Sequence, residues 1–159
     1  LGFPCFVKPA NMGSSVGITK VKEASQLKEA VELAAKYDSR IVVEKGLNVR
    51  EIECAVMGNE EPVASPVGEV IVGGEFYDFF DKYVNGKSTT QIPADLPNDL
   101  AEEIKQICIK GYRLLDCSGL ARVDCFVDKD SGKPYLNEIN TMPGFTSISM
   151  YPKMMQAHG

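Results

Sequence analysis

Hydrophobic positions recur with two different periods along the chain, and each period predicts a different kind of element. Alternation of apolar and polar residues, together with short apolar runs, predicts strands at 5–8, 18–21, 40–44, 51–57 and 62–72. Helical spacing predicts one helix after Ser25 and a second over 98–115, and a short helix can end the chain after Gly144. We expect Ser25 and Asn98 to cap the first two helices, because their side-chain oxygens can accept backbone N–H groups of a first turn.

The segment 119–144 predicts a β-hairpin that gathers most of the candidate chemistry. Two alternating runs, LARVDCFVD and KPYLNEIN, flank Asp130-Ser131-Gly132, which suits a three-residue loop with the glycine in the left-handed conformation. The register that follows from this loop gives four opposed pairs: Lys129 with Lys133, Phe126 with Leu136, Asp124 with Glu138, and Arg122 with Asn140.

The pair formed by Asp124 and Glu138 is a candidate metal site. Like charges that face each other directly across two strands are destabilising, so we expect a cation between them. Oxygen ligands from two carboxylates and the Asn140 amide favour a hard ion, Mg²⁺ or Mn²⁺, over zinc. The alternative is an ordinary pair of surface carboxylates, because a register shift of one residue would send the two side chains to opposite faces.

Composition is typical of a globular protein and argues against several functional classes. Its 159 residues suit one domain or two small lobes, and 44% hydrophobic with 25% charged residues allow a sizeable core. The net charge of −5 with scattered basic residues argues against a nucleic-acid surface, and no apolar run approaches the ~20 residues of a membrane span. Five cysteines without a CxxC pair indicate reduced core thiols in a cytoplasmic protein.

The order of the predicted elements favours an α+β protein with two lobes, the first ending near Leu47. We therefore expect a boundary between residues 1–47 and 48–159. The chain begins at Leu1 and enters directly into a strand-like run, so we also expect it to be part of a longer protein.

A Gly/Ser-rich loop after the first predicted strand is a candidate phosphate-binding segment. Lys8 precedes the run NMGSSVG, in which small residues let backbone N–H groups approach phosphate oxygens, and Ser14 and Ser15 add hydroxyl donors. The GxxxxGK[ST] pattern of a P-loop is missing, and an ordinary turn between two strands is the alternative.

Two further segments are candidates for binding a nucleotide, although each also fits an ordinary surface loop. Glu44 ends a strand and Glu51 follows seven residues later, so backbone groups can meet an adenine edge while a carboxylate accepts ribose hydroxyls. Lys82 opens a polar segment, 83–93, that we interpret as a mobile loop whose closure would bring a lysine to a phosphate.

The segment after the hairpin is a candidate for the second half of an acyl-transfer site. Gly144 follows a proline in a tight turn, where its backbone N–H can form part of an oxyanion hole. Ser147 and Ser149 lie close by in the sequence and can hold a carboxylate.

Five blocks of the sequence, in their order and spacing, resemble the D-alanine–D-alanine ligases of the ATP-grasp superfamily. The blocks are FVKPANMGSSVG, IVVEKGLNVREIECAV, YDFFDKY, GLARVDCFVD and YLNEINTMPGFTSISMYP, and together they cover essentially the whole chain. The resemblance implies an α+β, ATP-grasp fold in which two lobes with mainly antiparallel sheets sandwich the nucleotide. Residues 1–47 would belong to the central domain and 48–159 to the C-terminal domain, whereas the N-terminal domain is absent from the sequence.

The resemblance also implies a role for each matching residue. ATP would be bound at its phosphates by Lys8, Ser14, Ser15 and Lys82, at its adenine by Glu44, Lys45, Leu47 and Phe76, and at its ribose by Glu51. Two Mg²⁺ (or Mn²⁺) ions would be held by Asp124, Glu138 and Asn140. Arg122 and the Gly144 N–H would stabilise an oxyanion, Ser15 and Tyr83 would help to close the site, and Ser149 with the Met150 backbone would bind the carboxylate of the second D-alanine.

The implied activity is ATP-dependent ligation of two D-alanines through an acyl phosphate, for peptidoglycan synthesis, by a cytoplasmic homodimer. The Lys82-Tyr83 pair favours the dipeptide-forming type over ligases that make D-alanyl-D-lactate, whereas a D-alanine–D-serine ligase stays open. The block NTMPGFTSIS disfavours other ATP-grasp carboxylate–amine ligases. A further alternative is that this chain alone binds nucleotide and catalyses nothing, because an ATP-contacting lysine early in the central domain lies outside it.

Overall fold

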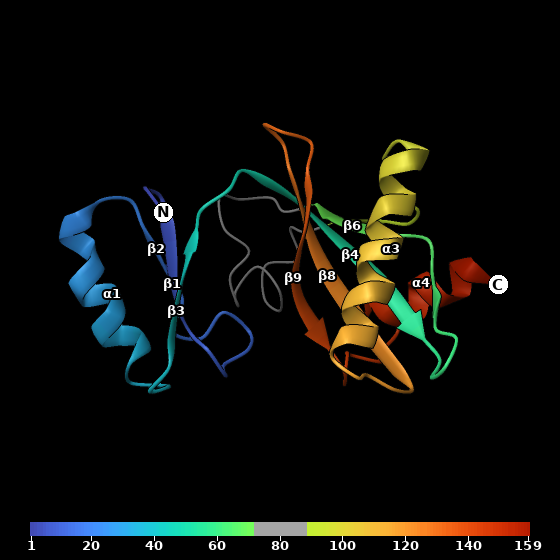
Figure 1. Ribbon diagram of the computed structural model, residues 1–159, viewed down its shortest axis with the longest axis horizontal. Helices are drawn as coiled ribbons and strands as arrows, with labels where there is room; N and C mark the ends of the chain where they lie inside the picture. Colours follow the sequence, from blue (N-terminus) through green and yellow to red (C-terminus); the bar gives the residue numbers. More distant parts are fainter. Residues whose placement is uncertain (72–88) are drawn as a thin grey trace. The chain divides into compact units, whose positions relative to one another are not determined.

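The computed structural model describes residues 1–71 and 89–159 and contains both helices and antiparallel sheets (Figure 1). The predicted α+β class is therefore confirmed. The described residues divide into two compact units: Leu1–Asn48 forms unit 1, and 49–71 together with 89–159 forms unit 2. Within these ranges, no helix is long and apolar enough to cross a lipid bilayer.

Unit 1 is a three-stranded antiparallel sheet with one helix on its face. The strand order is β2 (Thr19–Val21), β1 (Cys5–Pro9), β3 (Ile41–Lys45). The 3₁₀ helix η1 (Ala24–Gln26) leads into α1 (Leu27–Ala34), and α1 lies along β1 and β2 (Figure 1). Because side chains alternate along a strand, Cys5 and Val7 are buried under α1, while Phe6 and Lys8 lie on the opposite face.

The predicted caps of both helices are wrong by one or two residues. Ser25 lies inside η1, where its hydroxyl donates to Glu23 Oε1 at 2.6 Å, so the 3₁₀ helix takes the place of a capping turn. Asn98 is the first residue of α3 (Asn98–Leu114), and Pro97 holds the cap position with an extended backbone. Proline fixes the backbone at this entry, and the helix begins one residue earlier in the sequence than a cap at Asn98 would allow.

Unit 2 is built on a six-stranded antiparallel sheet with a helix packed against each face. The strand order is β7 (Thr89–Gln91), β6 (Gly68–Ile71), β4 (Val49–Met57), β8 (Leu120–Asp128), β9 (Pro134–Asn140), and β5 (Val63–Ala64) pairs with β4. The helix α3 covers one face, and α4 (Met150–His158) packs against β4 (Figure 1). The core beneath α3 is formed by Ile52, Cys54, Val56, Ile104, Cys108, Tyr112, Val123 and Cys125.

The predicted strand 62–72 is two strands, β5 and β6, and Ser65 stabilises the break between them. Its buried hydroxyl accepts the Ala55 N–H at 3.0 Å and donates to the Pro66 carbonyl at 2.8 Å. Pro66 has no N–H and cannot continue the ladder. The segment 83–93, predicted to be irregular, also contains the strand β7.

The substitution Ser65→Ala is expected to lower the free energy of unfolding by about 1–3 kcal/mol, because the buried Ala55 N–H loses its hydroxyl acceptor. Chemical denaturation of the chain measures this change. Ser118→Ala, at an exposed position, is the matched control and is expected to change stability by less than about 0.5 kcal/mol. Equal losses in the two variants would contradict the role given to Ser65.

The predicted hairpin forms, but its loop is one residue longer than predicted. Asp128 N–H donates to the Lys133 carbonyl at 3.0 Å, and Gly132, with the expected left-handed φ of 70°, donates to the Asp128 carbonyl at 2.7 Å. The Asp128 carboxylate also accepts the Ser131 hydroxyl at 2.5 Å, and these bonds close the loop at Asp128 rather than at Lys129. The predicted Lys129–Lys133 pair is therefore wrong.

A β-bulge restores the predicted register at the candidate site. The register shifts between Asp124 and Cys125, and Asn137 is the extra residue on β9. Without the shift, Asn137 itself would face Asp124, and Glu138 would turn toward the core. The observed pairs are Val127 with Pro134, Phe126 with Tyr135, Cys125 with Leu136, Asp124 with Glu138, Val123 with Ile139, and Arg122 with Asn140. The predicted Phe126–Leu136 pair is wrong, and the two pairs that matter for the site are correct.

Candidate functional site

Asp124, Glu138 and Asn140 converge on one face of the β8–β9 hairpin. The Asn140 Nδ2 donates to Asp124 Oδ2 at 3.0 Å and to Glu138 Oε1 at 3.2 Å, so the amide bridges the two carboxylates. Alternation along β8 turns the neighbours Val123 and Cys125 into the core beneath α3. Asn140 therefore contacts both of the carboxylates that the sequence grouped with it.

Arg122 lies beside this group and contacts two carboxylates. Its Nε and Nη2 donate to the two oxygens of Asp124, both at 2.7 Å, and its Nε lies 3.3 Å from Glu53 Oε2. Burial disfavours the charged guanidinium, but Asp124, Glu53 and Glu138 outweigh that effect and raise the pKa of Arg122. Arg122 is therefore a fixed positive charge on this face at neutral pH.

Glu53 belongs to this group, although the sequence did not single it out. It faces Asp124 across the β4–β8 ladder, and its side chain is only 13% exposed. Alternation along β4 puts Glu51 and Glu53 on one face, but only the pairing of β4 with β8 shows that Glu53 meets Arg122. The described contacts thus gather three carboxylates around one guanidinium, which leaves a net charge of −2.

The donor set fits a hard divalent cation. Two carboxylates and one amide offer oxygen ligands of the kind that Mg²⁺ and Mn²⁺ prefer, and the net charge of the group matches a dication. In the part of the chain that the structure describes, no three His, Cys, Asp or Glu side chains are arranged as a metal site. The Asn140 amide is therefore the candidate third ligand: its Oδ1 would have to face a bound cation, which would share the Asp124 carboxylate with Arg122.

Glu51 and the helix α4 lie on the same side of the unit 2 sheet. Glu51 is two positions along β4 from Glu53, so both side chains share one face. Gly68 of β6 pairs with Glu53, and a Cβ added there would lie 2.6 Å from Met150 Cε. The start of α4 therefore borders the face that carries the carboxylates and Arg122.

The predicted oxyanion donor and the predicted carboxylate-binding residues meet at the N-terminus of α4. Ser149 holds the N-cap position, its Oγ accepts the Thr146 N–H at 3.0 Å, and a Cβ added to Gly144 would lie 2.9 Å from the same Oγ. Met150 is the first helical residue, so its N–H has no carbonyl partner within the helix. Gly144, Ser149 and the Met150 backbone are therefore close together.

Lys8 and Glu44 form an ion pair on the face of the unit 1 sheet opposite α1. Lys8 Nζ lies 2.8 Å from Glu44 Oε2, because the register of β1 and β3 makes the two residues diagonal neighbours. The sequence assigned these residues to different ends of a nucleotide, and the structure brings them together. Lys45 faces Cys5, so its side chain lies on the other side of the sheet, and Leu47 is partly exposed just beyond β3.

Ser14 and Ser15 form the turn of the loop between β1 and β2. Both adopt left-handed backbone conformations, with φ of 54° and 60°. Non-glycine residues rarely adopt this conformation, and strained residues of this kind cluster at binding sites. Turns of consecutive backbone N–H groups form concave anion-binding sites, which fits the phosphate role expected of this loop.

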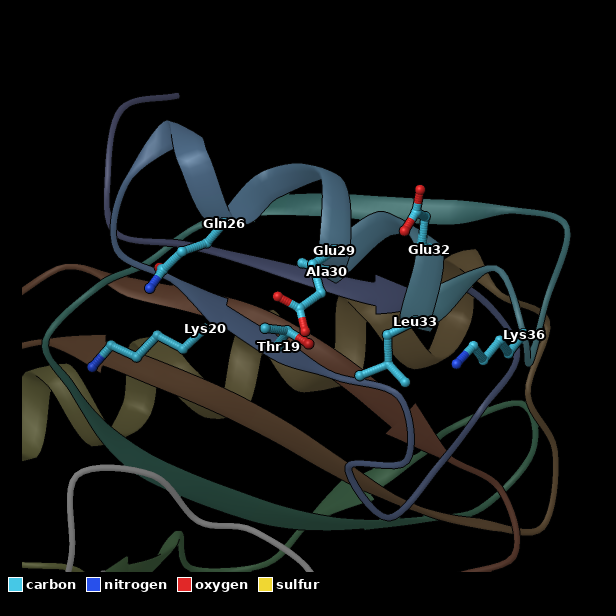
Figure 2. Close-up of a pocket in the computed structure, with 8 residues that line it drawn as sticks. All are labelled: Thr19, Lys20, Gln26, Glu29, Ala30, Glu32, Leu33 and Lys36. Atoms are coloured by element: carbon cyan, nitrogen blue, oxygen red, sulfur yellow. The ribbon is translucent and has the colours of Figure 1, made fainter.

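A shallow hollow of about 370 Å³ lies elsewhere in unit 1, between α1 and β2. Figure 2 shows Glu29 and Leu33 projecting from α1 toward the β2 side of this hollow. Its lining mixes lysine and glutamate side chains, and none of the predicted site residues takes part in it. Three predicted residues, Phe76, Lys82 and Tyr83, lie outside the described residues.

Comparisons with known proteins agree with the fold. A family model described as "D-ala D-ala ligase C-terminus" matches residues 1–159. The chain is 56% identical over 157 residues to the D-alanine–D-alanine ligase of Acetivibrio thermocellus, covering 99% of this chain and 42% of the relative. It is 55% identical over 160 residues to that of a Thermoanaerobacter species, covering 100% of this chain and 45% of the relative.

Solved structures of ligases also match this chain over nearly its whole length. The D-Ala:D-Ser ligase VanG from Enterococcus faecalis matches with a TM-score of 0.87 and 40% identity, over 100% of this chain and 46% of that one. The D-alanine–D-alanine ligase from Coxiella burnetii matches with a TM-score of 0.84 and 42% identity, over 99% of this chain and 41% of that one.

The fold and the strand order within each of the two sheets place the chain in the ATP-grasp class of proteins. Within that class it belongs to the D-alanine–D-alanine ligase family. The chain spans less than half the length of the curated relatives described above.

Proposed function

We propose that the full-length protein containing this chain is an ATP-dependent ligase that joins two D-alanines for peptidoglycan synthesis. The observation that carries the proposal is the convergence of Asp124, Glu138 and Asn140 beside Arg122, in a chain that matches the family over its whole length. A carboxylate is a poor acyl donor, so ATP would first convert the carboxylate of one D-alanine into an acyl phosphate.

Asp124, Glu138 and Asn140 would hold two Mg²⁺ or Mn²⁺ ions. When bound, these ions would offset the negative charge of the phosphates. The chain's own contribution is to fix the ligands in advance. Asn140 bridges the two carboxylates, and Arg122 holds the Asp124 carboxylate by two hydrogen bonds of 2.7 Å. The two bonds from Arg122 keep the Asp124 carboxylate in place, and Asn140 would turn its Oδ1 toward a bound cation.

Arg122 and the Gly144 N–H would stabilise the oxyanion that forms when the amine of the second D-alanine attacks. The raised pKa of Arg122 keeps its guanidinium charged throughout the reaction. Ser149 Oγ and the Met150 N–H would hold the carboxylate of that second D-alanine, and the unpaired N–H groups at the start of α4 favour an anion at this position.

The proposed nucleotide contacts are those that the family resemblance implies. Lys8, Ser14, Ser15 and Lys82 would contact its phosphates, Glu44, Leu47, Phe76 and the Lys45 backbone its adenine, and Glu51 its ribose. Ser15 and Tyr83 would help to close the site. Support within the described residues comes from the left-handed Ser14–Ser15 turn and from the contact between Lys8 and Glu44.

D-Alanyl-D-serine is the second candidate product, because the solved D-Ala:D-Ser ligase from Enterococcus faecalis matches the fold with a TM-score of 0.87. Phosphate release from ATP by the full-length protein, measured with D-alanine alone and with D-alanine plus D-serine, separates the two. Mass spectrometry then identifies the dipeptide. Phosphate release that does not depend on D-alanine would overturn the proposal.

We also propose that the full-length protein is a cytoplasmic homodimer, and that the 159-residue chain alone binds nucleotide without turnover. All five cysteines are free, which suits a reducing compartment. Dipeptide formation by the isolated chain would contradict the second proposal, and a monomeric mass of the full-length protein in solution would contradict the first.

A further inference from the structure

The loop at residues 11–17, which joins β1 to β2, holds an unfavourable backbone conformation at its tip. Three non-glycine residues among those described have a positive φ, and two of them, Ser14 and Ser15, are adjacent here. A Cβ atom disfavours this conformation, so it persists only where the surroundings enforce it. The loop's own backbone bonds are long: Val16 N–H to Gly13 O is 3.2 Å and Ile18 N–H to Ser15 O is 3.4 Å.

Asp38 holds the first end of this loop. Its Oδ2 accepts the backbone N–H of Asn11 at 2.9 Å and the side-chain Nδ2 of Asn11 at 2.7 Å. Its Oδ1 accepts the Arg40 N–H at 3.0 Å, just before β3 begins. One carboxylate therefore joins the start of the loop to the start of a strand. The Arg40 hydrogen bond, opposed in part by desolvation, lowers the pKa of Asp38, so it is ionised at neutral pH.

Tyr37, the neighbour of Asp38, lies against the other end of the loop. A Cβ added to Gly17 would lie 2.7 Å from Tyr37 Cδ2 and 2.9 Å from Pro9 Cγ, so the ring and the proline occupy the space beside this glycine. The N–H groups of Tyr37 and Asp38 both donate to the Ala34 carbonyl, at 3.0 and 3.2 Å. Ala34 is fully buried in the core of unit 1. Both ends of the loop therefore rest on one turn that α1 anchors.

We propose that Asp38, assisted by Tyr37, is a positioning residue that keeps the Ser14–Ser15 turn in the conformation that binds phosphate. The inference rests on the proposed nucleotide-binding function of this loop. A turn of backbone N–H groups binds an anion well only if the groups are aimed before the ligand arrives, because ordering a mobile loop would consume part of the binding energy. Asp38 lies at the base of the loop and acts on the phosphate only through the loop.

The test compares Asp38→Asn with Glu32→Gln in the 159-residue chain. Asparagine offers a single acceptor oxygen, so it cannot serve both Asn11 and Arg40 as the carboxylate does. Glu32 is an exposed residue of α1 whose change to glutamine removes the same charge. NMR measures amide hydrogen exchange of Asn11 and Val16 without any ligand, and calorimetry measures the affinities for ATP and for adenosine, which lacks phosphates.

The expected result for Asp38→Asn is faster exchange at Asn11 and Val16, with an ATP affinity weakened roughly tenfold, the scale of one lost charge-assisted hydrogen bond. Adenosine affinity is expected to stay within about twofold, because the proposed contacts of the loop are to the phosphates, which adenosine lacks. Glu32→Gln is expected to match the wild type in all three measurements. A purely structural role for Asp38 would weaken ATP and adenosine equally.

The outcomes distinguish a failure of the positioning role of Asp38 from a failure of the proposed phosphate-binding function of the loop. If the exchange rates in Asp38→Asn equal those of the wild type, or if ATP and adenosine weaken by the same factor, the positioning role is wrong. If the wild-type chain itself binds ATP no better than adenosine, the phosphate-binding function of the loop is wrong, and the exchange rates still decide whether Asp38 orders the loop.

Discussion

Replacing Asp124 by Asn and Glu138 by Gln together in the full-length protein is expected to reduce Mg²⁺-dependent ATP turnover by at least about 10³-fold. A metal ion contributes several kcal/mol of charge stabilisation in phosphoryl transfer, and each ~1.4 kcal/mol is a factor of ten in rate. The two amides keep the size of the side chains and can still bond Asn140, but they remove two of the three carboxylate charges around Arg122. Phosphate release at increasing Mg²⁺ concentration measures the loss.

Asp130→Asn is the matched control for this double variant. Asp130 is an exposed residue in the loop of the same hairpin, so its change removes a charge far from the candidate ligands. Turnover and the Mg²⁺ requirement are expected to equal those of the wild type. Binding of Mn²⁺ in the presence of ATP, followed by electron paramagnetic resonance, reports on the metal alone. Unchanged Mn²⁺ binding in the double variant would show that the ions are held by other residues.

Arg122→Met is expected to affect both catalysis and stability. The loss of an oxyanion donor lowers kcat by about 10²–10³-fold. The free energy of unfolding is expected to fall by about 1–3 kcal/mol, because Glu53 and Asp124, with side chains 13% and 16% exposed, lose their shared cation. Kinetics with saturating D-alanine measure the first effect, and chemical denaturation measures the second.

Adding Glu53→Gln to Arg122→Met separates these two effects. The double variant is expected to regain part of the stability, since one partly buried carboxylate that contacted Arg122 becomes neutral. It is expected to regain none of the turnover, because the guanidinium is still missing. Recovery of turnover in the double variant would mean that Arg122 serves only to neutralise Glu53 and takes no part in the reaction.

The hairpin illustrates how much of the site the sequence could predict. The alternation of LARVDCFVD and KPYLNEIN correctly grouped Asp124, Glu138, Asn140 and Arg122 on one face. The pairing of Asp124 with Glu138 was reached through a loop that is one residue too short, and the bulge at Asn137 compensates for that error. Sequence alternation reveals faces, but it reveals neither the local hydrogen bond from Ser131 to Asp128 in the loop nor the bulge on β9.

The residues that the sequence missed all depend on contacts between distant segments. Glu53 belongs to the site because β4 pairs with β8, about seventy positions farther along the chain. Asp38 belongs to the loop anchor because it meets Asn11, 27 positions earlier. The predicted caps Ser25 and Asn98 failed for a local reason, since a 3₁₀ helix and a proline took their places. Spacing therefore predicted which side chains share a face of a strand, but neither the helix starts nor the contacts between distant segments.

The bulge at Asn137 also lies between the loop end of the hairpin and the end that carries the candidate site, so a distortion at one end need not reach the other. From Val49 to Met57, β4 pairs with β8 without interruption, so β8 is held along its full length, whereas β9 changes register once between the loop and the site. Strain introduced at the loop can therefore be absorbed at Asn137 before it reaches Glu138. The exposed loop between Asp128 and Lys133 is thus a suitable place to insert a spectroscopic label or a short tag without displacing the carboxylates.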